Sequence, residues 1–176
     1  MVEKFDHRLT FVIGGASSGK SSFAEAIATG LERPRFYIAT AQAYDAEMDA
    51  KIAAHKVSRG PDWITLEAPF DVAGALADIP ADHVVVIDCL TLWLSNLLLA
   101  GADLAEASIG LRRAMAICRA SIVAVSNETG QGIVPETSLG RQFRAAQGLL
   151  NQQVAAEAGR VAYVVAGLPL WLKGGQ

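Results

Sequence analysis

The sequence predicts an α/β domain with a doubly wound, mostly parallel sheet and helices on both faces. Short runs rich in β-branched and aromatic residues recur along the chain, separated by stretches of helical length. Each run is nearly continuous in apolar residues, which is typical of strands buried on both faces rather than on one. Regular alternation of strand and helix is the pattern of a doubly wound sheet.

The elements follow one another in a simple order. The expected strands cover residues 9–13, 35–40, 83–88, 121–126 and 161–166. The expected helices cover residues 20–30, 45–56, 71–78, 90–119 and 138–158, the fourth with a break near Gly101. Ligands of such sheets bind outside the carboxyl ends of the strands. We therefore expect the functional residues in the loops after Ile13, Thr40, Ile87, Ser126 and Ala166.

Composition limits the possible classes of protein. The chain has 176 residues, a net charge of −3 and 52% hydrophobic residues, so it can bury a full core and is not a disordered protein. No repeat, linker or low-complexity tract divides it, and we expect one domain over residues 1–176. The slightly acidic charge does not favour a protein that coats nucleic acid.

The cysteines and the apolar runs indicate where in the cell the protein is expected. Cys89 and Cys118 show no metal-ligand spacing, and a chain so poor in cysteine fits a reducing cytoplasm. The first apolar stretch runs into a polar glycine loop, unlike a secretory signal. Residues 84–100 are interrupted by Asp88, Ser95 and Asn96, which predicts a strand followed by a helix rather than a membrane span.

A phosphate-binding loop is the strongest motif. Residues 14–21 satisfy the pattern G-x-x-x-x-G-K-[ST] between a predicted strand and a predicted helix; they are Gly14, Gly15, Ala16, Ser17, Ser18, Gly19, Lys20 and Ser21. Its backbone N–H groups would bind phosphate oxygens. Lys20 would bridge the outer phosphates, and the Ser21 hydroxyl would bind Mg²⁺. The alternative is a glycine-rich turn that caps a helix. The motif makes the expected fold P-loop NTPase-type.

Asp88 is the candidate second magnesium residue. It ends the apolar run 84–87, where P-loop proteins place the acid that holds the magnesium shell. An alternative is that Asp88 only caps the following helix.

Other nucleotide-related motifs are missing from the sequence. No N-K-x-D type motif reads a guanine base, the nearest stretch being residues 127–130, and no protein-kinase signature occurs. A metabolic transferase is the class that remains.

His55 is the one histidine with suggestive neighbours. Met48, Ile52 and His55 fall on one helical stripe, and Lys56 and Arg59 follow. Adjacent cations would favour a neutral, nucleophilic imidazole that meets a triphosphate. From the residues alone, packing at a helix end is the stronger interpretation. His7 and His83 have ordinary structural interpretations.

Motifs along nearly the whole chain resemble one family, the bifunctional adenosylcobinamide kinase and adenosylcobinamide-phosphate guanylyltransferase of cobalamin biosynthesis. They read VIGGASSGKSSFAE, YIATAQAYDAEMDAKIAAHKVSRGPDWITLEAP, VIDCLTLWLSNLL, VSNETGQGIVPE, RQFRAAQGLLNQQVAAEAG and VVAGLPLWLK. The phosphate loop is generic. The stretches around His55, Asp88 and SNETGQGIVP are specific to the family.

The resemblance implies roles for individual residues. It makes His55 the histidine that becomes guanylylated, and it makes Lys20 the second catalytic residue. The implied nucleotide-binding residues are Gly14 to Ser21, Ala39, Thr40, Ala41, Lys56, Val57, Ser58, Arg59, Glu67 and Asp88. On its own, Glu67 would pass for an ordinary solvent-facing acid.

The resemblance also implies two reactions at one site. ATP or GTP would phosphorylate the aminopropanol hydroxyl of adenosylcobinamide, and His55 would then transfer GMP from GTP to give adenosylcobinamide-GDP. Mg²⁺ is the implied cofactor, and a homotrimer is the implied assembly. A monofunctional kinase and a nucleotide-dependent assembly module are the competing hypotheses.

Some features stay open at this level. The chain departs from relatives at Ser17, where they often carry Arg, at Ala145, and at Gly159-Arg160. Five residues are candidates for corrinoid contact but could equally be caps or surface pairs: Asn127, Glu128, Gln131, Arg141 and Arg144. Six apolar residues could pack in the core or line a subunit interface: Trp63, Trp93, Trp171, Leu97, Leu98 and Leu99.

Overall fold

The computed structural model describes residues 6–42 and 60–175. The strands are β1 (Asp6–Gly14), β2 (Arg35–Ala39), β3 (Trp63–Glu67), β4 (Val84–Asp88), β5 (Ser121–Asn127), β6 (Ala158–Val165) and β7 (Leu168–Lys173). The helices are α1 (Lys20–Gly30), α3 (Val72–Ala77), α4 (Leu90–Leu99), α5 (Leu104–Ile117) and α6 (Ser138–Glu157). The expected helix over 45–56 lies outside the described residues.

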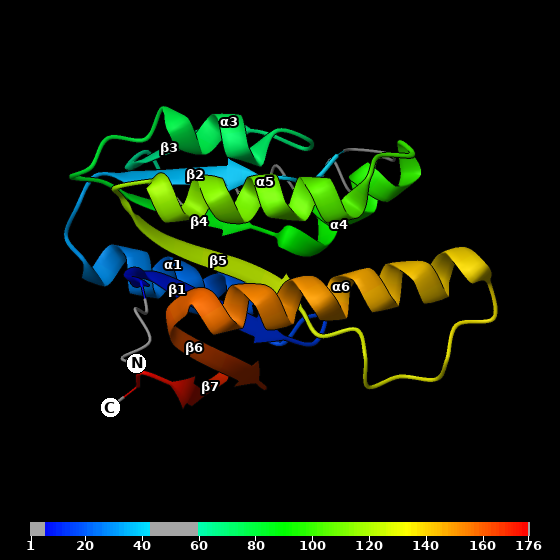
Figure 1. Cartoon of the computed structure of the whole chain (residues 1–176). Helices are drawn as coiled ribbons and strands as arrows, with labels where there is room; N and C mark the ends of the chain where they lie inside the picture. The colour runs from blue at the N-terminus through cyan, green and yellow to red at the C-terminus, as the bar shows by residue number, and fades with distance from the viewer. Residues whose placement is uncertain (1–5, 43–59, 176) are drawn as a thin grey trace, which may run out of the picture.

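The described strands form one seven-stranded sheet in the order β3-β2-β4-β5-β1-β6-β7. All neighbouring pairs are parallel except β6 with β7, which is antiparallel. The predicted mostly parallel, doubly wound architecture is therefore confirmed, and it is that of a P-loop NTPase-type α/β fold. Figure 1 shows α4, α5 and α6 running across the near face of the sheet and α1 behind it.

Burial on both faces explains the continuous apolar runs. In β1, Leu9, Phe11 and Ile13 pack into the core under α3 to α6, whereas Val12 packs into a second core with Ala24 and Ala28 of α1. The same alternation recurs in β4 and β5. Each strand therefore needs an apolar residue at nearly every position.

Two strands were not predicted from the sequence. β3 reads WITLE and is only partly buried, and β7 reads LPLWLK with Leu168, Leu170 and Leu172 exposed. Both are edge strands, so neither has the continuous burial that marks the central strands. The expected helix over 90–119 is two helices, separated by residues 100–103, which confirms the break near Gly101.

Candidate active site

The phosphate loop connects the end of β1 to the start of α1. Gly19 is the N-cap of α1 with φ 91°, and no side chain caps the helix. The N–H groups of the first turn are thus left for an anionic ligand, which the helix dipole also favours. A Cβ at Gly19 would lie 3.0 Å from the Gly167 Cα, so glycine is needed both for the conformation and for the close approach.

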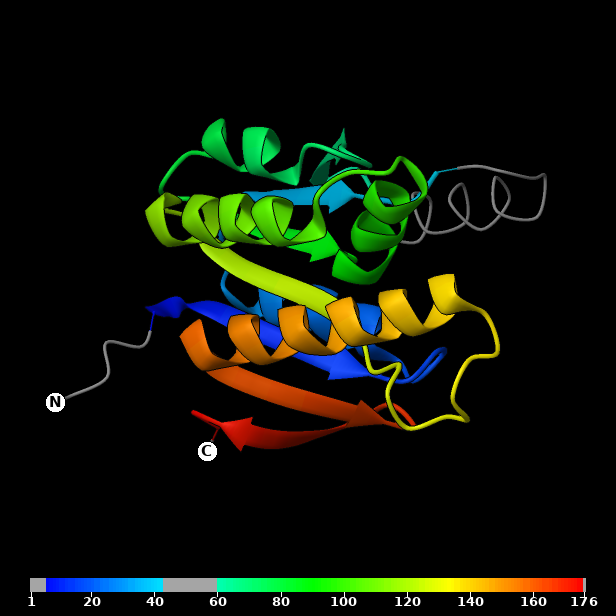
Figure 2. The ribbon, with the colours of Figure 1, turned by 45° about the vertical axis from the view of Figure 1, so that its right-hand side comes forward.

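The turn between β6 and β7 supports this loop. Gly167 N–H donates a hydrogen bond to the Ser18 carbonyl oxygen at 2.8 Å. Ala166 and Gly167 have φ of 51° and 78°, as a tight two-residue hairpin requires. The C-terminal hairpin, which sequence reasoning missed, is therefore part of the phosphate loop's scaffold. Figure 2 shows its two strands at one edge of the sheet.

Lys20 lies inside the loop rather than on the surface. Its side chain is 8% exposed, and Nζ donates to the Gly15 carbonyl oxygen at 3.1 Å. Ser18 Oγ is buried and has no hydrogen-bond partner within the described residues. A buried ammonium on one backbone carbonyl and an orphaned hydroxyl both fit a loop whose remaining partners are phosphate oxygens.

Strand register aligns three of the predicted residues. Ala39 pairs with Glu67 on one side and with Asp88 on the other, so the three residues form a row at the carboxyl ends of β3, β2 and β4. Thr40 and Ala41 follow Ala39 directly, and Thr40 N–H donates to the Asp88 carbonyl oxygen at 3.2 Å. The fold thus brings together residues that are up to 49 positions apart in sequence.

The Asp88 carboxylate is hydrogen-bonded to β2 and does not cap α4. Its Oδ2 accepts a hydrogen bond from the Tyr37 hydroxyl at 2.7 Å. The N-cap of α4 is Cys89, and no side chain caps that helix, so the capping interpretation of Asp88 is wrong. The sequence did not single out Tyr37, whose hydroxyl orients one oxygen of this carboxylate.

Thr40 joins the ends of β2 and β4. Its Oγ1 donates to the Cys89 carbonyl oxygen and accepts from the Cys89 N–H, both at 2.7 Å. Asn96 Nδ2 donates to the carbonyl oxygens of Thr40 and Pro69, both at 2.9 Å. These bonds fix the loops after β2 and β3 to α4, which gives Thr40 a structural role beside its predicted nucleotide contact.

Cys89 lies next to Asp88 and is fully enclosed. Burial, and secondly the negative charge of Asp88, raise the pKa of its thiol to about 11. The thiol therefore stays protonated at neutral pH and is not a nucleophile of the site.

A buried polar cluster that sequence reasoning missed lies behind the end of β5. Ser126 Oγ donates to Asn151 Oδ1 at 2.7 Å, and Gln147 Nε2 donates to both Ser126 Oγ and Asn151 Oδ1 at 2.9 Å. Thr91 Oγ1 lies 3.3 Å from Ser126 Oγ. The cluster links α4, β5 and α6. Gln147 and Asn151 are four residues apart on α6 among apolar neighbours, and that spacing was the available signal.

The loop of residues 128–137 connects β5 to α6 and is fastened to α6 by two arginines. Arg141 Nη1 donates to the carbonyl oxygens of Pro135 and Glu136, at 3.0 and 2.6 Å, and the Arg144 guanidinium donates to the Gly130 carbonyl oxygen. A pocket of about 470 Å³ lies between loop and helix, lined by Gly130, Val134, Pro135, Arg141, Arg144, Ala145, Gly148, Leu149 and Gln152. Three of these, Arg141, Arg144 and Ala145, had been singled out from the sequence.

The other predicted site residues differ in how exposed they are, and some lie outside the described residues. Ser21 is half-buried in the first turn of α1, Ala16 and Ser17 are exposed, and Glu67 is exposed at the end of β3. The stretch from His55 to Arg59 (His55, Lys56, Val57, Ser58, Arg59) lies outside the described residues. His83 lies at the amino end of β4, opposite to the carboxyl ends that carry the site, with Nδ1 2.8 Å from Asp82, in keeping with its structural interpretation.

The tryptophans pack within the chain. Trp93 is 3% exposed and its Nε1 donates to the Phe70 carbonyl oxygen at 2.8 Å. Trp63 packs edge-on against Tyr37, and Trp171 against Phe23. Of the leucines, Leu97 packs on the core and Leu99 is 64% exposed. Core packing therefore accounts for Trp93, Trp63 and Leu97, whereas Trp171 is half-buried on the edge strand β7.

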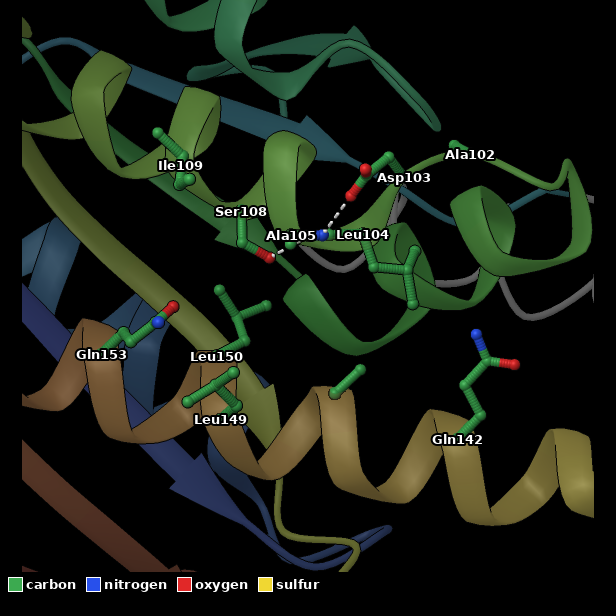
Figure 3. A pocket seen from close by; sticks show the side chains of 11 residues that line it. Ala102, Asp103, Leu104, Ala105, Ser108, Ile109, Gln142, Leu149, Leu150 and Gln153 are labelled. Atoms are coloured by element: carbon green, nitrogen blue, oxygen red, sulfur yellow. Dashed lines mark hydrogen bonds between the residues drawn. The ribbon is translucent and has the colours of Figure 1, made fainter.

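A further pocket, of about 430 Å³, lies between α5 and α6. Figure 3 shows Leu104, Ile109, Leu149 and Leu150 on its walls, with the amides of Gln142 and Gln153 at its ends. Its residues belong neither to the phosphate loop nor to the strand ends around that loop.

The described residues bear on metal and membrane binding as well. Within residues 6–42 and 60–175, no group of three His, Cys, Asp or Glu side chains could hold a metal ion by itself. A magnesium ion bound mainly by nucleotide phosphates needs only one or two protein ligands, as Ser21 and Asp88 would supply. None of the helices described is long and apolar enough to cross a membrane.

Comparison with known proteins gives the family. The sequence model of the family described as cobinamide kinase / cobinamide phosphate guanyltransferase matches residues 10–172. The bifunctional adenosylcobalamin biosynthesis protein CobP of Pseudomonas aeruginosa is 44% identical over 168 residues, covering 93% of this chain and 96% of its own. The bifunctional adenosylcobalamin biosynthesis protein CobU of Escherichia coli is 39% identical over 181 residues, covering 94% and 99%.

Solved structures add a likeness of fold alone. A protein from Pyrococcus horikoshii superposes with a TM-score of 0.51 at 9% identity, over 96% of this chain and 87% of that chain. The family match and the curated relatives both extend over nearly the whole sequence. The chain belongs to the cobinamide kinase / cobinamide phosphate guanyltransferase family, and it is a bifunctional kinase and guanylyltransferase of cobalamin biosynthesis.

Proposed function

We propose that both activities use one nucleotide site, formed by the phosphate loop and the row Glu67–Ala39–Asp88. ATP or GTP phosphorylates the aminopropanol hydroxyl of adenosylcobinamide, and His55 then carries GMP from GTP to the phosphorylated corrinoid. The observation that carries the proposal is that the uncapped phosphate loop, Lys20 and Asp88 all lie at the carboxyl ends of the parallel strands. The remaining predicted nucleotide-binding residues would contact the parts of the nucleotide outside its phosphates. They are Ala39, Thr40, Ala41, Lys56, Val57, Ser58, Arg59 and Glu67.

Mg²⁺ fits the residues present. Ser21 and Asp88 would hold it, and when bound it neutralises charge on the phosphates. Tyr37 keeps the Asp88 carboxylate in place. The orphaned Ser18 hydroxyl and the free first turn of α1 fit the phosphates themselves.

In the kinase reaction, the corrinoid hydroxyl oxygen forms a bond to the γ-phosphorus, and the bond from that phosphorus to its bridging oxygen breaks. The nucleoside diphosphate leaves. Lys20 and the loop amides stabilise the charge on the transferring group. These groups are already oriented by the protein, so little reorganisation is needed as the reaction proceeds.

In the guanylyl transfer, an imidazole nitrogen of His55 forms a bond to the α-phosphorus of GTP and expels pyrophosphate. An oxygen of the corrinoid phosphate then attacks the same phosphorus, the P–N bond breaks, and adenosylcobinamide-GDP is released. A neutral nitrogen approaches the triphosphate with less repulsion than a phosphate anion, which divides one difficult displacement into two easier ones. His55 follows Gln42 by 13 positions, and a chain of that length can span at most about 45 Å.

Labelled GTP tests the proposal. With α-labelled GTP and Mg²⁺, the protein should acquire label that is acid-labile and base-stable, and γ-label should pass to adenosylcobinamide. His55→Ala should abolish the protein label and retain the γ-transfer, whereas His83→Ala, at the amino end of β4, should retain both. γ-Transfer without any protein-bound α-label would leave only a kinase, and a nucleotide-driven change in assembly size without turnover would favour an assembly module.

The resemblance also supports a homotrimer in the cytoplasm. The measured mass in solution should be three times 18.5 kDa. A monomer mass at the concentrations used for assay would contradict the trimer and leave the two reactions untouched.

A further inference from the structure

We propose that Glu128 is the general base of the kinase reaction and takes the proton from the acceptor hydroxyl as its oxygen attacks the γ-phosphorus. This inference rests on the proposed reaction at the phosphate loop. The proton passes from the hydroxyl to the Glu128 carboxylate, the oxygen's electron pair forms the new P–O bond, and the bond to the departing nucleoside diphosphate breaks. A carboxylate fills the same role in other phosphoryl transfers.

Of the carboxylates at the strand ends, sheet topology places Glu128 nearest to the phosphate loop. Among the described residues, three carboxylates end or directly follow parallel strands: Glu67 on β3, Asp88 on β4 and Glu128 after β5. Neighbouring strands are about 4.8 Å apart, so β3, β4 and β5 lie about 19, 10 and 5 Å from β1. Asp88 is proposed to serve the metal, and Glu67 is too far away to reach the γ-phosphate. Glu128 remains.

The backbone fixes Glu128 against the phosphate loop. Its N–H donates to the carbonyl oxygen of Gly14, the first loop residue, at 3.0 Å. The preceding residue, Asn127, is held on both sides, because its N–H donates to Thr91 Oγ1 at 2.7 Å and its carbonyl accepts from Asn151 Nδ2 at 3.0 Å. The buried polar cluster thus fixes the backbone on the N-terminal side of Glu128.

The Glu128 side chain is also oriented. Its carboxylate accepts a hydrogen bond from Gly130 N–H, and Gly130 is held in turn by Arg144 through its carbonyl oxygen. A Cβ at Gly130 would lie 2.7 Å from Glu128 Oε1. An alanine at position 130 would therefore require the end of the Glu128 side chain to move.

A pocket that could take the acceptor begins close to Glu128 in the same loop. The 470 Å³ pocket under the loop begins at Gly130, two residues after Glu128, and continues along α6. Val134, 64% exposed, gives it an apolar wall, and Arg141 and Arg144 give it hydrogen-bond donors. An amphipathic acceptor rich in amides suits such a lining.

The decisive experiment measures the two reactions separately in the full-length protein. Glu128→Gln keeps an oxygen that can accept from Gly130 but cannot take a proton, so kcat of the kinase reaction should fall about 100-fold or more. KM for the acceptor and the rate of α-label transfer to the protein should stay within about twofold of wild type, as removal of a proton acceptor alone predicts. Glu128→Asp should recover part of the kinase rate.

A second variant displaces the base without removing it. Gly130→Ala should lower the kinase rate in the same selective way, because its methyl group would crowd Oε1 and displace the carboxylate. Gly132→Ala is the matched control, since a Cβ there meets nothing within 4 Å, and Glu136→Gln controls for charge at an exposed glutamate of the same loop. Both controls should retain the kinase rate.

The result that overturns the inference is a kinase rate for Glu128→Gln close to wild type, or an equal loss of both reactions in the folded variant. Neither result touches the proposed function, which is judged on the wild-type protein. If wild type transfers no γ-label to adenosylcobinamide, the proposed function itself fails.

Discussion

The Tyr37 hydroxyl donates a hydrogen bond to Asp88 Oδ2 at 2.7 Å, from β2 to the end of the neighbouring strand β4. One oxygen of the carboxylate is thereby oriented before any ligand binds. Partners of this kind tune metal affinity without touching the metal.

Tyr37→Phe should therefore weaken magnesium binding while leaving the fold intact. Because the ring remains in the core and only the hydroxyl is lost, we expect the Mg²⁺ concentration for half-maximal kinase activity to rise about tenfold. A magnesium titration of the variant measures this. Tyr163→Phe, on the far side of β1, is the control. An unchanged magnesium requirement would contradict the positioning role of Tyr37.

Lys20→Met should abolish nucleotide chemistry in a protein that still folds. Methionine can fill the buried path of the lysine side chain, but it carries no charge for the phosphates. Both the γ-transfer and the α-labelling should drop by about 100-fold or more. Lys173→Met is the matched control, because Lys173 Nζ binds the carbonyl oxygens of Ala155 and Ala156 at the end of α6. That variant should lose a little stability and no activity.

Thr40→Val should be costly to stability. It leaves the Cys89 N–H without its buried partner, whereas the Cys89 carbonyl oxygen keeps its bond from Trp93 N–H at 3.2 Å. One unsatisfied buried group predicts a loss of about 1 to 3 kcal/mol in the free energy of unfolding. Urea denaturation measures it. Thr40→Ser keeps the hydroxyl and should recover most of the loss. A fully stable valine variant would show that solvent or the neighbouring backbone replaces these bonds.

Stability should fall in alkaline solution because of Cys89. Burial, then the Asp88 charge, raise the pKa of the thiol in the folded protein to about 11. Between the ordinary value, about 9, and about 11, the folded protein therefore holds a proton that the unfolded chain has released. Stability then decreases with rising pH, by about 1.4 kcal/mol per pH unit in that window.

Cys89→Ala removes this contribution. The difference in unfolding free energy between variant and wild type should shift in favour of the variant as pH rises from about 9 to about 11. A difference that stays constant with pH would show that the thiol is not protected from ionisation. Comparison of the two proteins cancels the lysines and tyrosines that titrate in the same range.

The central sheet and the phosphate loop could be predicted because the burial or the backbone conformation of each residue determines its residue type. Runs such as Val84 to Ile87 are apolar at every position because both faces are covered, and the pattern from Gly14 to Ser21 allows few other structures. Gly101 indicated the separation of α4 from α5 because glycine favours the positive φ of 71° that ends the helix there.

The remainder depends on contacts between distant segments. Nothing near Tyr37 shows that its hydroxyl meets Asp88, and nothing near Gly167 shows that it lies under Gly19. β3 and β7 escaped prediction because edge strands lack the double burial that marks the others. For His55 the residues alone favoured packing, and its catalytic role stays a prediction that labelling must test.

The bond between Gly167 and Ser18 has a consequence for how the protein is made. The nucleotide loop is synthesised well before the turn that braces it, because Gly167 follows Ser18 by 149 positions. A nascent chain that has not yet been extended through this turn lacks the brace, so the nucleotide pocket reaches its finished form only after the turn has left the ribosome.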